Sequence, residues 1–145
     1  MNKIIVQPEQ YLVGISCRTS NAKGEGEVAI PALWQEFFNL DDFPNKLSND
    51  IIALYSDYET DHLSPYTLTI GYQVANFDEV PTELTKKVIP QSTFAVFPVH
   101  TPPPQGILET WQTIWNTDLP RTYAGDFERY HADQKTIEIL IAVKE

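Results

Sequence analysis

One short segment of the chain holds residue types that could recognise a charged organic molecule. It reads Phe127-Glu128-Arg129-Tyr130-His131. On a β-strand, alternate side chains point to the same face, so Glu128 and Tyr130 would share one face while Phe127 and Arg129 share the other. A carboxylate walled by aromatic rings attracts cationic or polarised apolar compounds, because each ring face adds roughly 0.5–2 kcal/mol of cation–π attraction. Glu128 is therefore the candidate centre of a binding pocket.

The aromatic residues that could surround Glu128 come from other predicted elements. If only this segment is considered, a glutamate such as Glu128 more often lies at the surface in a salt bridge than in a binding pocket. Tryptophans on one-sided helical stripes are likewise more often plain core than ligand walls. With both alternatives open, the predicted ligand-binding set is Glu128, Tyr130, Trp111, Trp34, Phe38 and Tyr72.

Two amphipathic helices are predicted. Residues 32–39 carry a one-sided stripe of large apolar side chains, with Pro31 placed where a first helical turn tolerates its missing N–H group. A second stripe begins at Ile107, and Pro120 prevents this helix from continuing beyond Leu119. Its members are Ile107, Leu108, Trp111, Ile114 and Trp115.

The remaining segments are predicted to be strands, and their order suggests an internal repeat. The predicted strands are residues 11–16, 51–59, 66–74, 93–99, 127–131 and 136–144. Residues 51–59 and 66–74 should pair as an antiparallel hairpin across the polar loop 60–65, and 127–131 with 136–144 should form a closing hairpin. Residues 80–88, which lie between prolines, read as an irregular connection.

The repeat is visible in short sequence matches. Trp34-Gln35-Glu36-Phe37-Phe38 corresponds to Trp111-Gln112-Thr113-Ile114-Trp115, and Pro8-Glu9-Gln10-Tyr11 corresponds, with one insertion, to Pro90-Gln91-Ser92-Thr93-Phe94. We therefore expect an α+β fold made of two βαββ repeats, with two helices packed on one shared antiparallel sheet. Residues 1–145 would form a single domain, with pseudo-repeats at about 1–78 and 79–145.

Composition excludes several classes of function. Ten Lys and Arg against twenty Asp and Glu give a net charge of −10, so the chain repels nucleic-acid phosphates and no direct nucleic-acid binding is expected. The single cysteine and the scattered histidines predict no metal site, and no Gly-rich phosphate loop or other cofactor motif occurs. No signal peptide or membrane span is expected, which predicts a soluble cytoplasmic protein.

The chain resembles the GyrI-like small-molecule-binding domain, the effector-binding domain of multidrug-responsive AraC- and MerR-type transcription regulators. The resemblance covers nearly the whole chain. Its motifs are Leu54-Tyr55-Ser56-Asp57, Ile70-Gly71-Tyr72-Gln73-Val74, Val80-Pro81, Ile89-Pro90, Phe94-Ala95-Val96-Phe97, Trp111 with Ile114-Trp115, Arg121-Thr122-Tyr123, Asp126-Phe127-Glu128-Arg129-Tyr130 and Ile137-Glu138-Ile139. It implies the doubled βαββ fold, a ligand groove between the halves and a pocket glutamate at Glu128. The helix-turn-helix of the multidrug regulators has no counterpart here.

Three functions are compatible with this reading. The leading prediction is a stand-alone effector-binding protein that binds a hydrophobic, aromatic or cationic organic ligand at Glu128. The first alternative is a hydrolase of electrophilic small molecules in which Glu128 acts as general base on water; no other catalytic residue is assigned. The second is a protein-interaction modulator, such as a gyrase inhibitor, whose acidic surface contacts a protein partner that the sequence does not identify.

Overall fold

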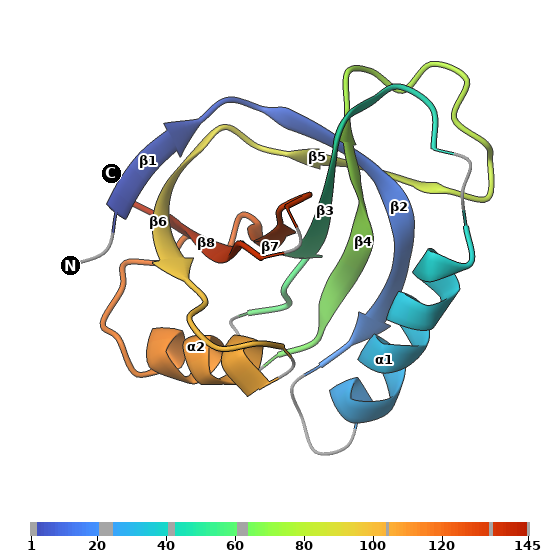
Figure 1. Ribbon diagram of the computed structural model, residues 1–145. Coiled ribbons are helices and arrows are strands. Elements are labelled where there is room, and N and C mark those ends of the chain that lie inside the picture. Colours follow the sequence, from blue (N-terminus) through green and yellow to red (C-terminus); the bar gives the residue numbers. More distant parts are fainter. Residues whose placement is uncertain are drawn as a thin grey trace.

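The computed structural model describes residues 3–20, 25–40, 43–60, 64–103, 105–133 and 135–144. These residues form two helices and eight strands (Figure 1). The helices are α1 (Glu25–Phe38) and α2 (Gln105–Trp115). The strands are β1 (Lys3–Gln7), β2 (Gln10–Thr19), β3 (Lys46–Ser56), β4 (Tyr66–Val74), β5 (Thr85–Ile89), β6 (Ser92–Pro98), β7 (Asp126–Tyr130) and β8 (Ile137–Val143). The predicted α+β class is confirmed.

The strands form one sheet with an internally symmetric order. The order is β1-β6-β8-β7-β3-β4-β2-β5, and every pairing between these strands is antiparallel. If β1 to β4 are exchanged with β5 to β8, the same order is read in reverse. The two halves are therefore related by a pseudo-two-fold axis that passes between β3 and β7. The predicted pair of βαββ repeats on a shared antiparallel sheet is confirmed.

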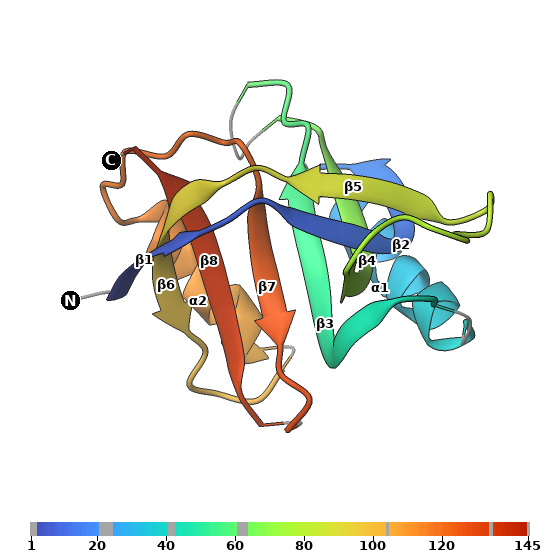
Figure 2. The same cartoon turned by 90° about the horizontal axis from the view of Figure 1, so that it is seen from above.

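A proline divides the first strand of each repeat in two. β1 ends before Pro8 and β2 begins after it, while β5 ends before Pro90 and β6 begins after it. Proline has no N–H group to donate to a neighbouring strand, so the pairing is interrupted there. The first piece then reaches the other half of the molecule: β1 pairs with β6, and β5 pairs with β2 (Figure 2).

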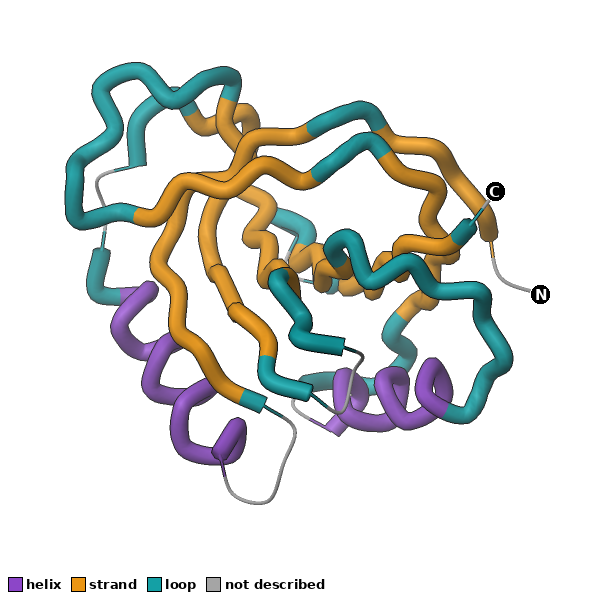
Figure 3. Tube along the Cα trace, turned by 180° about the vertical axis from the view of Figure 1, so that it is seen from behind, coloured by secondary structure: helices purple, strands orange, loops and turns teal. Residues whose placement is uncertain are grey.

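The sheet bends over on itself and separates two apolar faces. On the inner face, strands from both halves pack together through buried residues such as Leu12, Ile52, Phe94, Phe127 and Leu140. Both helices lie against the outer face, where Figures 1 and 3 show them apart from each other, one over each half of the sheet. Helix α1 contacts β2 and β4, and α2 packs on β6 and β8. The helices leave the central pair β3 and β7 uncovered between them.

Two predicted boundaries were wrong. Residues 80–88 were expected to be irregular, but β5 occupies Thr85–Ile89. Its sequence is mostly polar and shows little alternation of apolar and polar residues, so it was not recognised as a strand. The strand pairs through its backbone with β2, which is distant in the sequence. Pro31 was expected in the first turn of its helix, but α1 begins at Glu25 and contains Pro31 in its interior. Helix α2 ends at Trp115, which agrees with the prediction that it does not continue beyond Leu119.

The two predicted hairpins are present. β3 pairs with β4 and β7 pairs with β8, both antiparallel. Residues 61–63 of the predicted loop between β3 and β4 lie outside the described residues.

Within the described part of the chain, neither helix is long and apolar enough to cross a membrane.

Candidate functional site

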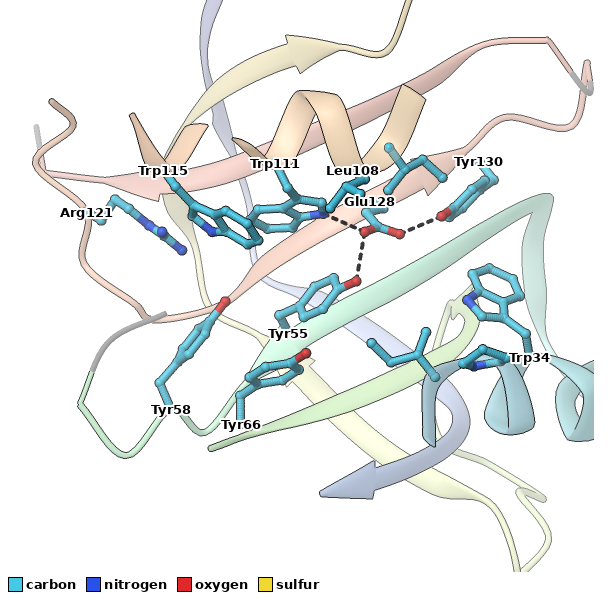
Figure 4. Close-up of a pocket in the computed structure, with 13 residues that line it drawn as sticks. Trp34, Tyr55, Tyr58, Tyr66, Leu108, Trp111, Trp115, Arg121, Glu128 and Tyr130 are labelled. Carbon is cyan, nitrogen blue, oxygen red and sulfur yellow. Dashed lines mark hydrogen bonds between the residues drawn. The ribbon is translucent and has the colours of Figure 1, made fainter. Parts of the chain in front are cut away.

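A cavity of about 540 Å³ lies between the two helices, over the outer face of the central strands (Figure 4). Its walls come from one side of α1 and one side of α2, and its floor comes from β3, β4 and β7. Most of its lining is aromatic or aliphatic. The lining residues are Ile30, Pro31, Trp34, Tyr55, Tyr58, Tyr66, Ile107, Leu108, Trp111, Trp115, Arg121, Glu128 and Tyr130.

Glu128 lies at the floor of this cavity and accepts three hydrogen bonds. Its exposed fraction is 2%, and on β7 it stands opposite the small Ala53 of β3. The Trp111 indole N–H donates to Glu128 Oε2 at 2.7 Å, and the Tyr55 hydroxyl donates to the same oxygen at 2.8 Å. The Tyr130 hydroxyl donates to Oε1 at 2.5 Å. Three elements therefore fix the position of one carboxylate.

The cavity perturbs the acid–base properties of these groups. Burial raises the pKa of Glu128 above its ordinary value, because a low-dielectric site disfavours the charged form, and the hydrogen bonds from Tyr130, Trp111 and Tyr55 oppose this rise. Burial, with the nearby Glu128 charge, also raises the pKa of Tyr55 and of Tyr130. Both phenols therefore stay protonated near neutral pH and remain hydrogen-bond donors to Glu128.

A second buried acid lies on the same face of β7. Asp126 is fully buried and forms a salt bridge with Arg121, whose Nη2 lies 2.7 Å from Asp126 Oδ2. The Tyr58 hydroxyl donates to Oδ2, and the Ala142 N–H donates to Oδ1, each at 2.8 Å. Burial raises the pKa of Asp126, while the Arg121 charge and these donors oppose the rise. The pair contributes no net charge to the cavity when Asp126 is ionised.

Four of the six predicted ligand-binding residues meet at this cavity. Glu128, Tyr130 and Trp111 are joined by the hydrogen bonds above, and Trp34 packs edge-on against Tyr130 with ring centroids 5.1 Å apart. Phe38 and Tyr72 do not line it. Phe38 is 66% exposed and stacks on Trp34, whereas Tyr72 packs against Phe37 and Phe43 behind α1.

Sequence reasoning missed several lining residues. Tyr55 lies on a predicted strand, and the register that places Ala53 beside Glu128 would have identified it. Tyr58 and Arg121 lie in irregular segments, where side-chain direction follows no period.

Among the described residues, no cluster of three or more His, Cys, Asp or Glu side chains could hold a metal ion.

Comparison with known sequences gives two matches that cover most of the chain. A family model described as an integron-associated effector binding protein matches residues 3–143. The protein YobU of Bacillus subtilis (strain 168), which is named as a candidate transcriptional regulator, is 37% identical over 145 residues and is matched over 90% of each chain.

Solved structures share the fold. An integron cassette protein from the mobile metagenome of Vibrio cholerae has a TM-score of 0.80 at 24% identity, over 98% of this chain and 95% of that one. The protein SAV2435, solved bound to tetraphenylphosphonium, has a TM-score of 0.76 at 18% identity, over 99% of this chain and 94% of that one.

Proposed function

The chain belongs to the family of integron-associated effector binding proteins. We propose that it binds hydrophobic organic cations in the cavity between α1 and α2. Membership of this family supports small-molecule binding and agrees with the resemblance drawn from the sequence motifs. The observation that carries the finer proposal is the buried Glu128 at the floor of an aromatic cavity. In this proposal Glu128 supplies the counter-charge and the rings supply the apolar surface.

The charge balance of the cavity favours a cation. Arg121 is already paired with Asp126, and no salt bridge to Glu128 occurs within the described part of the chain. An ionised carboxylate buried without a positive partner is costly. A cation with aromatic substituents would lower that cost and contact the rings of Trp34 and Trp111 at the same time. The tetraphenylphosphonium bound to SAV2435 is a ligand of this kind.

The same geometry favours a fixed charge over a general base. Burial raises the pKa of Glu128, and the hydrogen bonds that both of its oxygens already accept oppose that rise and help to keep the group ionised. A general base needs a free lone pair directed at its substrate or at water. Counter-charge is therefore the role that we assign to Glu128, in preference to hydrolysis.

Titration calorimetry with tetraphenylphosphonium tests the proposal. Glu128→Gln keeps the shape of the side chain and removes its charge, so we expect affinity to fall at least tenfold, because each 1.4 kcal/mol of lost attraction is a factor of ten. The matched control is Glu138→Gln on the neighbouring β8, where the acid bonds to His131 outside this cavity. Equal affinities for wild type and Glu128→Gln, or no binding by wild type, would contradict the proposal.

A further inference from the structure

The cavity straddles the pseudo-two-fold axis of the molecule, and its central acid lies beside that axis. Pro8 and Pro90 stand at equivalent points of the two repeats, and the strand registers that follow them make Ala53 of β3 equivalent to Glu128 of β7. These registers run from Ile15 through Ile70 to Ala53 in one half, and from Phe97 through Ile139 to Glu128 in the other. Ala53 and Glu128 also pair directly across the axis. The cavity therefore has equivalent positions on either side of Glu128.

A tyrosine and a tryptophan form the same aromatic pair in each half. Tyr55 of β3 and Tyr130 of β7 lie at equivalent positions. The Trp111 ring packs against Tyr55 with ring centroids 5.1 Å apart and planes at 68°. The Trp34 ring packs against Tyr130 with centroids 5.1 Å apart and planes at 78°. We call Trp34 with Tyr130 the α1 pair and Trp111 with Tyr55 the α2 pair; each joins a helix of one half to a central strand of the other.

The helix residues beside these tryptophans match as well. In the alignment of the two repeats that superposes the tryptophans, Ile30 corresponds to Ile107 and Pro31 corresponds to Leu108. All four of these residues line the cavity. The walls that α1 and α2 contribute are therefore built from equivalent positions.

The charge is the part of the site that is not doubled. Ala53, the equivalent of Glu128, has no polar side-chain atom. The Tyr55 and Tyr130 hydroxyls donate to different oxygens of Glu128. Figure 4 shows the α2 pair on one side of Glu128 and the α1 pair on the other. One negative charge therefore lies between two aromatic pairs.

This arrangement favours a ligand with two rings. A cation held at Glu128 that carries one aryl group contacts one pair and leaves the other pair exposed to water. A second aryl group would contact the other pair, where it gains apolar burial and ring–ring attraction. Both tyrosines touch the carboxylate directly, at 2.8 and 2.5 Å, so rings bonded to the cationic atom itself are long enough to reach both pairs.

We propose that the cavity selects cations that carry two aryl groups on the charged atom, one for the α1 pair and one for the α2 pair. This rests on the proposed function and narrows its ligand class from hydrophobic cations to diaryl cations. Trp34 is the residue that separates the two roles. Trp111 donates a hydrogen bond to Glu128, whereas no hydrogen bond from Trp34 to Glu128 occurs among the described residues. Trp34 can therefore be changed without removing a donor from the acid.

Two probes that differ by one ring test the proposal. They are trimethyl(phenyl)phosphonium and dimethyl(diphenyl)phosphonium. We expect wild type to bind the diphenyl compound about tenfold or more tightly than the monophenyl compound in titration calorimetry. A ratio near one, or binding of tetraphenylphosphonium but of neither smaller probe, would overturn the diaryl selection and leave the proposed function intact. No binding of any of the three compounds would overturn both.

Variants assign the gain from the second ring to the α1 pair. Trp34→Ala should reduce the affinity ratio of the two probes to about threefold or less, while affinity for the monophenyl probe changes little because the α2 pair is intact. Phe38→Ala is the control, since Phe38 stacks on Trp34 from the same helix, is 66% exposed and does not line the cavity. It should keep the wild-type ratio.

A wild-type ratio that persists in Trp34→Ala would overturn the proposal, because the second ring would then lie elsewhere in the cavity, for example against Trp115 or Tyr58. If Trp34→Ala does not fold, Trp34→Leu keeps an apolar side chain at this position and should reduce the ratio in the same direction. An unchanged ratio in Trp34→Leu would equally overturn the proposal.

Discussion

At the scale of single residues, the cavity is organised around one acid that the fold buries but does not neutralise. The Trp111 N–H can only donate, so the oxygen facing it must accept. The Tyr130 hydroxyl can instead rotate and accept. A glutamine at position 128 could thus place its carbonyl oxygen toward Trp111 and Tyr55 and donate its amide to Tyr130. Every polar atom would keep a partner, and the buried charge would be gone.

Glu128→Gln should therefore be at least as stable as wild type at neutral pH. The pKa of Glu128 is raised in the folded protein, so the folded state binds this proton more tightly than the unfolded state does. Wild type therefore loses stability as pH rises from the ordinary value near 4.5 through the raised folded value. Glutamine does not titrate. The melting temperature of Glu128→Gln minus that of wild type should increase from pH 5 to pH 8.

Thermal melts of both proteins across that range measure the difference directly. The other titrating groups, including the buried Asp126, are present in both proteins, so their contributions largely cancel. A difference that stays constant with pH would show that Glu128 does not titrate above its ordinary range. A lower melting temperature for Glu128→Gln at pH 8 would show that the carboxylate stabilises the fold.

The candidate site was partly predictable from the sequence at this scale. Strand alternation correctly placed Glu128 and Tyr130 on one face, and the helical stripe brought Trp111 toward them. Phe38 does not line the cavity, although the sequence placed it there. An apolar stripe along a helix does not tell which edge of the stripe faces the other helix. Arg121 could not be found, because its position depends on an irregular segment attached to β8.

At the scale of elements, the cavity depends on how closely α2 approaches the loop that precedes it. Gly106 is buried in the first turn of α2, and a β-carbon there would lie 1.9 Å from the Thr101 carbonyl oxygen. That distance is far inside van der Waals contact, so any larger residue must push the helix away. Helix α2 also carries Trp111, which touches Glu128.

Gly106→Ala should therefore lower both stability and ligand affinity. Overpacking of this kind costs about 1–3 kcal/mol, which denaturant unfolding can measure. Moving α2 would also weaken the bond from Trp111 to Glu128 and reduce tetraphenylphosphonium binding in calorimetry. Gln105→Ala is the control, since residue 105 is exposed and adjacent. If Gly106→Ala unfolds and binds like wild type, α2 does not need this close approach.

Prediction of the elements succeeded where the local pattern reflects burial. β4 was predicted with the bounds it has, because apolar residues occupy every second position of its sequence. β1 was not predicted and β5 was read as irregular. Both are edge strands with exposed side chains, and their pairings join residues distant in sequence. Such strands depend on partners that no local window contains.

At the scale of the whole molecule, each repeat is completed by the other. β1 of the first half lies against β6, β5 of the second half lies against β2, and the central contact joins β3 to β7. The inner core combines both halves, with Leu12 and Ile52 from one and Phe94 and Phe127 from the other. The cavity is shared too, since Tyr55 and Trp111 reach Glu128 from different halves.

The last prediction follows from this exchange of strands: neither half should fold alone, whereas the two together should reassemble. A cut between Asp78 and Glu79 falls in an exposed connection before β5 and breaks no strand. Fragment 1–78 alone would expose the inner faces of β2 and β3, and fragment 79–145 would expose those of β6 and β7. We expect unfolded circular-dichroism spectra for each fragment, and a cooperative thermal transition with tetraphenylphosphonium binding when they are mixed in equal amounts. A cooperative transition in either fragment alone would show that one repeat is an independent folding unit, and the cavity would then lie at a docked interface between two small domains.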